Sequence, residues 1–276
     1  MNQEALISRL NELPRIESIQ QELLNMVNRD NVDFSELSRK MSMDQVLSAR
    51  VLRMANSAQF GGVNGKGVST ISDAIIRVGS GAVRTLISSS VVSGVFPQLR
   101  TLNIKDYWSN TFEIAMIASK LAKPLKLDPN EVFTTGVLHN IGELMIHALE
   151  PNLAEQIEQR VKQGEKRADV QQDLLGVDAQ QLGAQLAKAW NFPVDMADAI
   201  EHVNHPGQAG EAKRLACVLY LARDIHKRWD SLFDVHEKQA FLARHPAAKA
   251  LALAPESHGL IDQVRGQGAE LAHQLF

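Results

Sequence analysis

The sequence has a single cysteine, and this scarcity excludes several kinds of protein. With Cys217 alone, neither an internal disulfide nor a metal site built from several thiolates can form. Cys217 lies in an apolar run, so we expect it to be a small buried side chain. Because a chain without disulfides is suited to a reducing compartment, we expect a cytoplasmic protein.

The sequence also lacks an excess of charge and is poor in aromatic residues. Lysine and arginine number 29 against 32 aspartate and glutamate residues, and aromatic residues make up 5% of the chain. We therefore expect no strong attraction to nucleic acid or anionic lipid, and few side chains on which bases could stack. No apolar run approaches the roughly eighteen residues of a membrane span, and the first residues do not resemble a signal peptide. We expect a soluble protein with neither a nucleic-acid nor a membrane partner.

What the sequence does have is helical periodicity along nearly its whole length. Apolar residues recur at spacings of three and four, while the two-residue alternation of an exposed strand is not evident. This pattern predicts an all-α fold, a multi-helix bundle. The expected helices cover about 16–27, 44–56, 70–79, 82–96, 107–121, 129–149, 152–163, 167–175, 178–190, 194–203 and 209–229, with further short helices after residue 245.

Two features of the first hundred residues invite a functional interpretation that their details do not support. The glycine-rich segment 61–67 contains a Gly-Lys pair, but its spacing and the lack of a following Ser or Thr exclude a phosphate-binding loop, so we expect a solvated loop. Arg50, Arg53, Arg77 and Arg84 could form a basic strip, and we expect them to lie on a solvated helix face.

The strongest candidate for chemistry is His139 with Asn140, in a helix expected to be central. His139, Glu143 and His147 would lie along one side of that helix, where they could in principle offer nitrogen and oxygen ligands to a metal. At about 1.5 Å per residue, however, the three span about 12 Å and cannot all reach one ion.

A second pair of histidines, His202 and His205, precedes Pro206 and could add ligands from another helix. Histidines at such a position are more typical of helix C-terminal caps, where they interact with the last carbonyl groups. The residues alone therefore favour buried or capping histidines over a metal site.

Five segments follow one another in a recognisable order and spacing. They are Leu13-Pro14, the Ala-Asn-Ser-Ala stretch within 52–61, residues 71–79, Gly-Val-Leu-His-Asn-Ile-Gly at 136–142, and 199–202 with Pro206. Taken together, they resemble the HDOD domain family. The similarity covers residues 13–206, as an N-terminal lobe over 13–100 and an HD-like lobe over 101–206, with 207–276 as a helical extension packed on it. This resemblance implies a bacterial signal-transduction protein with the helical bundle of the HD-domain phosphodiesterases.

The resemblance also implies where a metal site would lie and how this sequence departs from it. Catalytic relatives hold metals with an upstream histidine, a His-Asp pair and a further aspartate. Here Asn110 stands where the upstream histidine is expected, Asn140 replaces the aspartate of the pair beside His139, and Ala179 occupies a position where many relatives carry histidine. With His202 in the closing helix, these positions resemble a degenerate site, for which we expect no catalytic residue, no metal and no cofactor.

We therefore expect a non-catalytic regulatory binding domain or scaffold of a bacterial signalling system. Its partner would be a signalling protein, with a nucleotide-like small molecule as a further candidate ligand. Asn56, Ser57 and Arg77, in the most specific part of the resemblance, are candidates for contacting the ligand or partner. The alternative is a metal-dependent phosphohydrolase acting on a nucleotide or cyclic dinucleotide, with a divalent metal at His139 and with Asn140 and His202 in an altered site.

Overall fold

A computed structural model of the chain describes residues 18–29, 31–56, 67–96, 99–190 and 192–275, and its described residues form helices without any strand. The prediction of an all-α fold is thereby confirmed. Leu13-Pro14, Ser57 and most of the glycine-rich segment lie outside the described residues. The chain divides into a smaller compact unit, mainly Arg15–Val95, and a larger one, mainly Phe96–Ala272. The division into a family domain over 13–206 and an extension stays a prediction.

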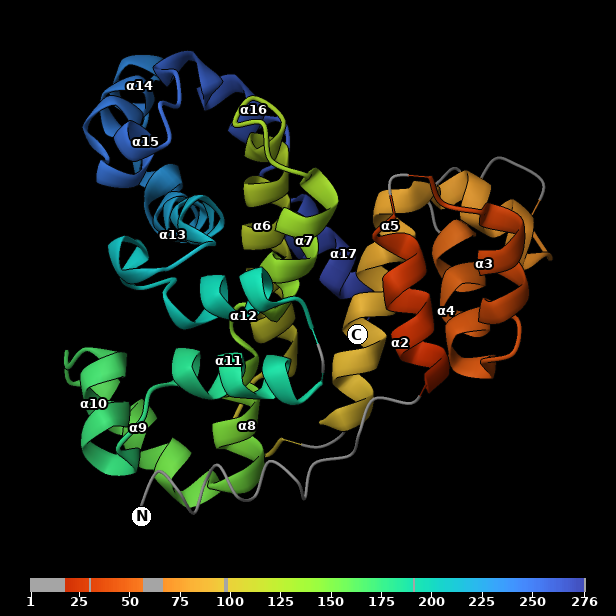
Figure 1. The fold of residues 1–276 in the computed structure, drawn as a ribbon, viewed down its shortest axis with the longest axis horizontal. Helices are drawn as coiled ribbons and strands as arrows, with labels where there is room; N and C mark the ends of the chain where they lie inside the picture. Colours follow the sequence, from red (N-terminus) through yellow and green to blue (C-terminus); the bar gives the residue numbers. More distant parts are fainter. Residues whose placement is uncertain (1–17, 30, 57–66, 97–98, 191, 276) are drawn as a thin grey trace. The chain divides into compact units, whose positions relative to one another are not determined.

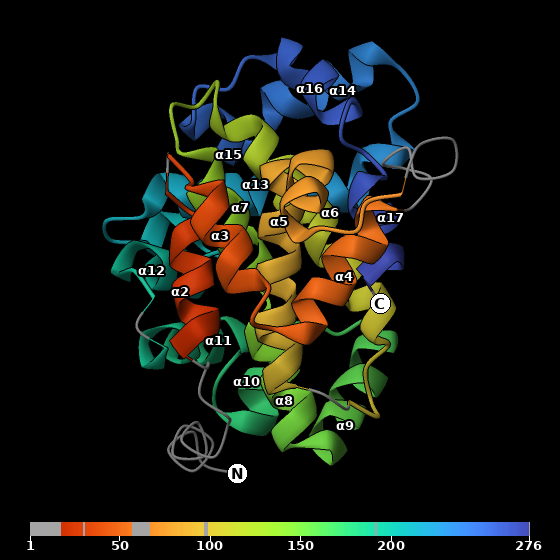
Figure 2. The same ribbon diagram turned by 90° about the vertical axis from the view of Figure 1, so that its right-hand side faces the viewer.

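The described residues of the smaller unit form four helices, three of which pack on the fourth (Figure 2). Asp33 and Asp44 begin two of these helices as N-caps, each accepting hydrogen bonds from two backbone N–H groups of the first turn. The core of this unit includes Leu23 and Leu86, which lie in predicted helices, and Met41, which lies in a helix that was not among those expected. The four helices are α2 (Ser18–Val27), α3 (Phe34–Met41), α4 (Gln45–Ala55) and α5 (Ile71–Val95).

Helix α5 bends at Gly79, whose φ of 82° and ψ of 164° lie outside the helical region. The break predicted between two helices at this point is therefore confirmed. Among the described residues, the segment Ile71–Gly94 is the one helix long and apolar enough to cross a membrane, but 67% of its window is buried, as in a core helix.

Arg84 of α5 contradicts the prediction that the arginines of this unit lie on a solvated face. It is 7% exposed and donates from Nε and Nη2 to the carbonyl oxygen of Val27, at 2.9 and 2.8 Å. That carbonyl belongs to the last turn of α2, where it has no helical partner. The prediction failed because it considered one helix and not the helix end packed against it.

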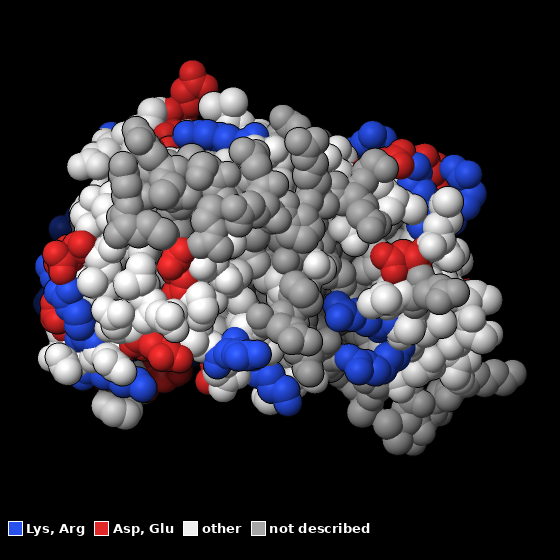
Figure 3. All heavy atoms as spheres, turned by 90° about the horizontal axis from the view of Figure 1, so that it is seen from below, with Lys and Arg blue, Asp and Glu red and all other residues white. Residues whose placement is uncertain are grey.

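The larger unit is built around α6 (Ile104–Ala122), which packs between α7 (Pro129–Leu138) and α13 (Lys213–Arg228) (Figure 1). Cys217 of α13 is 6% exposed within this core, as predicted. On the face seen in Figure 3, the described residues carry charges of both signs. The other helices are α8 (Ile141–Leu149), α9 (Pro151–Lys162), α10 (Arg167–Leu175), α11 (Ala179–Ala189), α12 (Val194–Glu201), α14 (Val235–Arg244), α15 (Pro246–Ala250), α16 (His258–Asp262) and α17 (Gln267–Leu275).

Two glycines on either side of His139 allow their helices to approach others closely. A Cβ atom on Gly136 would lie 2.7 Å from the Cα of Ala115 in α6. A Cβ atom on Gly142 would lie 1.8 Å from the carbonyl oxygen of Ala179, at the start of α11. Both positions exclude any side chain, because real contacts of Cβ atoms are much longer. The two glycines thus hold the segment between them tightly against α6 and α11.

Candidate functional site

The segment between α7 and α8 carries His139 and Asn140, and it corrects the prediction of one helix over 129–149. Helix α7 ends at Leu138, and Asn140 has a non-helical φ of −118° and ψ of 17° before α8 begins at Ile141. Nδ1 of His139 lies 2.5 Å from the carbonyl oxygen of Gly136. The imidazole thus binds a carbonyl in the last turn of α7, and the chain turns there. His139 and Glu143 consequently lie on different helical segments.

This hydrogen bond fixes the tautomer of His139. A carbonyl oxygen only accepts, so Nδ1 carries the proton and Nε2 keeps a lone pair. The side chain is 3% exposed. Burial, with the charge of Arg223 as the next cause, lowers the pKa of His139 to about 3. At neutral pH the residue is therefore an uncharged acceptor, held as metal-binding histidines often are by a second hydrogen bond.

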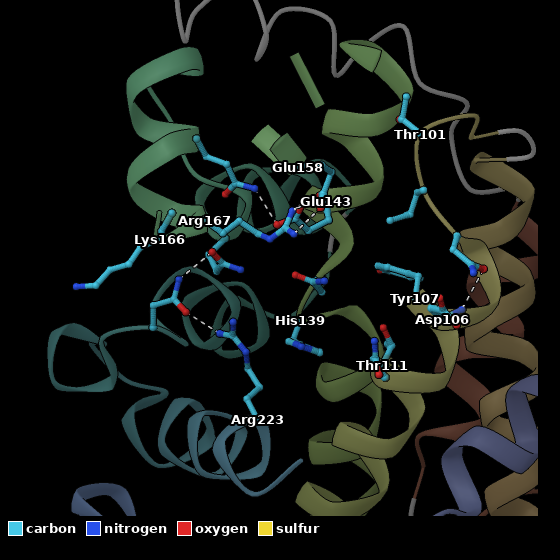
Figure 4. A pocket seen from close by; sticks show the side chains of 18 of the residues that line it. Thr101, Asp106, Tyr107, Thr111, His139, Glu143, Glu158, Lys166, Arg167 and Arg223 are labelled. Carbon is cyan, nitrogen blue, oxygen red and sulfur yellow. Dashed lines mark hydrogen bonds and ion pairs between the residues drawn. The ribbon is translucent and has the colours of Figure 1, made fainter. Parts of the chain in front are cut away.

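His139 opens onto a cavity of about 1040 Å³ in the larger unit (Figure 4). Asn110 of α6 and Asn140 line the same cavity, so the structure brings together three of the four positions predicted for the degenerate site. The fourth, His202, is not among the described residues that line it. His202 ends α12, where its Nδ1 lies 2.9 Å from Oδ1 of Asp198. Its neighbour His205 does line the cavity.

Glu143 is the buried acid of the cavity wall, and its carboxylate is already engaged. Oε1 accepts from Nε2 of Gln171 at 2.8 Å, and Oε2 lies 3.5 Å from Nη1 of Arg167. Burial raises the pKa of Glu143, while the charge of Arg167 opposes the rise. Arg167 is itself held by both carboxylate oxygens of Glu158. Glu143 therefore belongs to a network of polar and charged side chains that line the cavity.

His147, the third residue of the array seen in the sequence, is not among the residues that line the cavity. Its Nδ1 lies 2.7 Å from Oγ1 of Thr101, and its Nε2 lies 3.8 Å from Oε1 of Glu158. The structure therefore brings His139 and Glu143 to the cavity without His147.

Sequence reasoning missed a chain of three polar side chains on the opposite wall. Arg223 of α13 donates from Nη1 to Oδ1 of Asn204 at 2.6 Å, and Nδ2 of Asn204 donates to Oε1 of Gln180 at 2.9 Å (Figure 4). One signal was present in the sequence, because Arg223 follows the apolar run at 215–222 on a helix that is otherwise buried there. Three segments distant in sequence thus converge on the cavity.

Asn110 has a defined partner as well. Nη1 of Arg265 donates to Nδ1 of His226 at 3.2 Å, so the proton of that imidazole lies on Nε2. Nε2 donates in turn to Oδ1 of Asn110 at 3.0 Å. The carbonyl of Asn110 is therefore engaged by His226 of α13, which is not among the lining residues.

These residues do not fit the metal site of the catalytic relatives. Nε2 of His139 suits a divalent metal, but Asn110 and Asn140 are neutral amides that cannot supply the charge of a bridging carboxylate. Glu143 is bound to Gln171 and Arg167. Within the part of the chain that the structure describes, no three His, Cys, Asp or Glu side chains come together to hold an ion.

Two residues predicted to contact a ligand or partner, Asn56 and Arg77, lie in the smaller unit. Asn56 ends α4, and its side chain both donates to the carbonyl oxygen of Val68 and accepts from the N–H of Val68, each at 2.8 Å. It therefore joins the two ends of the segment 57–67. Arg77 lies on α5. Whether these residues contact a ligand or partner stays a prediction.

Comparison with known proteins identifies relatives over almost the whole chain. Residues 13–206 match the HDOD domain. The chain is 38% identical to a "putative phosphohydrolase" from Shewanella amazonensis SB2B of known crystal structure, with a TM-score of 0.81 and coverage of 99% of this chain and 98% of that one. An HDOD domain protein of unknown function from Geobacter sulfurreducens shares the fold at 22% identity, with a TM-score of 0.75 and coverage of 97% and 98%.

A further relative is known by sequence. An uncharacterized protein of Treponema pallidum (strain Nichols) is 26% identical over 222 residues, which is 79% of this chain and 43% of that protein. The chain thus spans less than half the length of that relative.

Proposed function

Because the chain belongs to the HDOD domain family, we propose that it is a non-catalytic regulatory binding domain of a bacterial signalling system. In this proposal the cavity beside His139 binds a small molecule, for which a nucleotide-like compound is the candidate. A signalling protein is the partner that reads the state of the domain. The domain acts in the cytoplasm and uses neither nucleic acid nor a membrane as its partner.

One observation carries the proposal: the cavity beside His139 has amides at positions where the family resemblance implies metal ligands. Asn110 and Asn140 line it together with His139. An amide presents both a donor and an acceptor without charge, so such groups bind polar ligands but do not compensate a divalent cation. A cavity of this size is suited to a small organic molecule. The geometry therefore supports binding better than hydrolysis.

Phosphodiester turnover by the purified protein tests this function. The substrates would be bis(p-nitrophenyl) phosphate and a cyclic dinucleotide, each assayed with added manganese, iron, zinc or magnesium. We expect no turnover above that of His139→Ala. His202→Ala is a matched control, since it removes an imidazole that does not line the cavity. Turnover that His139→Ala abolishes and His202→Ala preserves would overturn the proposal.

The second candidate function is a metal-dependent phosphohydrolase. Two observations favour it: Nε2 of His139 keeps a lone pair in a cavity, and the Shewanella relative, at 38% identity, carries the name "putative phosphohydrolase". In that case His139 would bind a divalent metal, and the turnover assay above would give the positive result.

A further inference from the structure

We infer that Arg223 anchors an anion site in this cavity and that the ligand it binds carries a phosphate group. The inference rests on the proposed function, because it assigns a chemical class to the ligand of the same cavity. Arg223 gives the lining of this cavity the fixed positive charge of a guanidinium.

The first argument is that Arg223 has only part of its hydrogen-bonding capacity in use. A guanidinium has five N–H donors, and the described residues offer Arg223 one acceptor, Oδ1 of Asn204. No carboxylate of the described residues forms an ion pair with Arg223, although Glu143 lies near enough to attract it, whereas Arg167 is held by Glu158 and Glu143. Arg223 therefore has N–H donors that remain available to a ligand in the cavity.

The second argument is the surroundings of this cation. Its neighbours in the cavity include the amides Asn204 and Gln180 and the uncharged imidazole of His139. Because Oε1 of Gln180 accepts from Asn204, the amide NH₂ of Gln180 is left as a further donor on the same wall. Figure 4 shows Arg223 and His139 extending toward the same part of the cavity. Donors on one side and the acceptor Nε2 of His139 on the other suit an anion that also has a hydroxyl group.

The third argument concerns the class of anion. The planar fork of arginine binds phosphate and carboxylate through paired hydrogen bonds. The cavity, at about 1040 Å³, is far larger than one ion needs, so the anion is a group on a larger molecule. Lys162 and Lys166 line it as well, but so do five acids, and the choice of phosphate therefore rests on the guanidinium of Arg223 and not on the net charge of the lining. The acids are Asp106, Glu143, Glu155, Glu158 and Asp169.

The test uses the full-length protein and isothermal titration with adenosine 5′-monophosphate, inorganic phosphate and acetate as probes. We expect saturable binding of the two phosphate probes and none of acetate. Arg223→Met should weaken this binding roughly 10- to 100-fold, which is the effect of losing a charge-assisted hydrogen bond. Arg228→Met is the matched control, because it removes the same charge from an exposed position of α13.

A second variant tests the inference independently in case Arg223→Met does not fold. Asn204→Asp keeps the shape of the side chain but places a carboxylate on the guanidinium, and Gln180 can turn its amide to donate to it. We expect Asn204→Asp to lose phosphate binding while unfolding at the temperature of the wild type or above. Arg223→Lys, which keeps the charge without the fork, should bind with intermediate affinity.

Three results would overturn the inference. The first is that neither adenosine 5′-monophosphate nor inorganic phosphate binds, and the second is that Asn204→Asp and Arg223→Met leave their binding unchanged. The third is saturable binding of acetate with the same affinity as the phosphate probes. These failures are distinguishable from failure of the proposed function. A protein without turnover that binds no phosphate remains a binding domain for another ligand. Turnover lost in His139→Ala contradicts the proposed function whatever Arg223 binds.

Discussion

Acid should destabilise the protein through His139 by an amount that the structure allows us to work out. The pKa of His139 is about 3 in the folded protein, against 6.5 for the ordinary side chain. Because the folded-state pKa is lowered, the stability that neutral His139 contributes to the folded protein is fully present above pH 6.5. It is lost as the pH falls from 6.5 toward 3. In this range the unfolded chain binds a proton that the folded protein does not.

The size of the effect between pH 7 and pH 5 follows from the two pKa values. Since one pKa unit corresponds to about 1.4 kcal/mol, His139 should cost the folded state about 2 kcal/mol over this interval. The measurement is urea unfolding of the wild type and of His139→Gln at both pH values. The comparison uses only the change in the free energy of unfolding of each protein between pH 7 and pH 5, so a difference in stability between the two proteins at pH 7 does not affect it. Other buried groups, such as His147 and Glu143, titrate in both variants and cancel.

We therefore predict that the wild type loses about 2 kcal/mol more than His139→Gln between pH 7 and pH 5. Long-range ¹H–¹⁵N spectra of the wild type should show a proton on Nδ1 and a bare Nε2 throughout this range. Equal losses in the two variants, or an imidazole that titrates near pH 6, would refute the account of a buried neutral His139.

Two further predictions concern packing and the C-terminal helix. Gly142→Ala should lower the free energy of unfolding by about 1–3 kcal/mol or more, because its Cβ would meet the carbonyl of Ala179; Gly259→Ala, where nothing lies within 4 Å, should change it little. Equal thermal unfolding of these two variants would contradict the packing. Glu113→Ala should cost about 3 kcal/mol, because the carboxylate binds Arg265 at 2.9 Å and two backbone N–H groups at the start of α17. Limited proteolysis should then release α17 faster, and unchanged protection would count against this role.

The helices were predictable where their signals are local. Apolar periodicity predicted most of the long helices, and the ranges expected at 70–79 and 82–96 placed a break at Gly79. The break at Asn140 was not recognised, because it involves a hydrogen bond from the ring of His139 to the backbone and no glycine or proline at the turn itself. Local sequence does not reveal where such a side chain will point.

The site was predictable in part for a similar reason. The family resemblance selected Asn110, His139 and Asn140, which the structure places on one cavity. It did not select Asn204 and Arg223, because their role depends on contact between helices far apart in the chain. The signal that would have selected Arg223 is a charged residue directly after the apolar run at 215–222, and its importance became clear once the burial of α13 was known.

The retention of metal by the purified protein tests the central claim most directly. The wild type, His139→Ala and His202→Ala would each be dialysed against a mixture of manganese, iron, zinc and magnesium salts, then against buffer, and analysed by elemental mass spectrometry. We predict no retained metal in any of the three, because amides at Asn110 and Asn140 leave His139 without charged co-ligands. One or two equivalents held by the wild type and by His202→Ala, but lost in His139→Ala, would contradict the account.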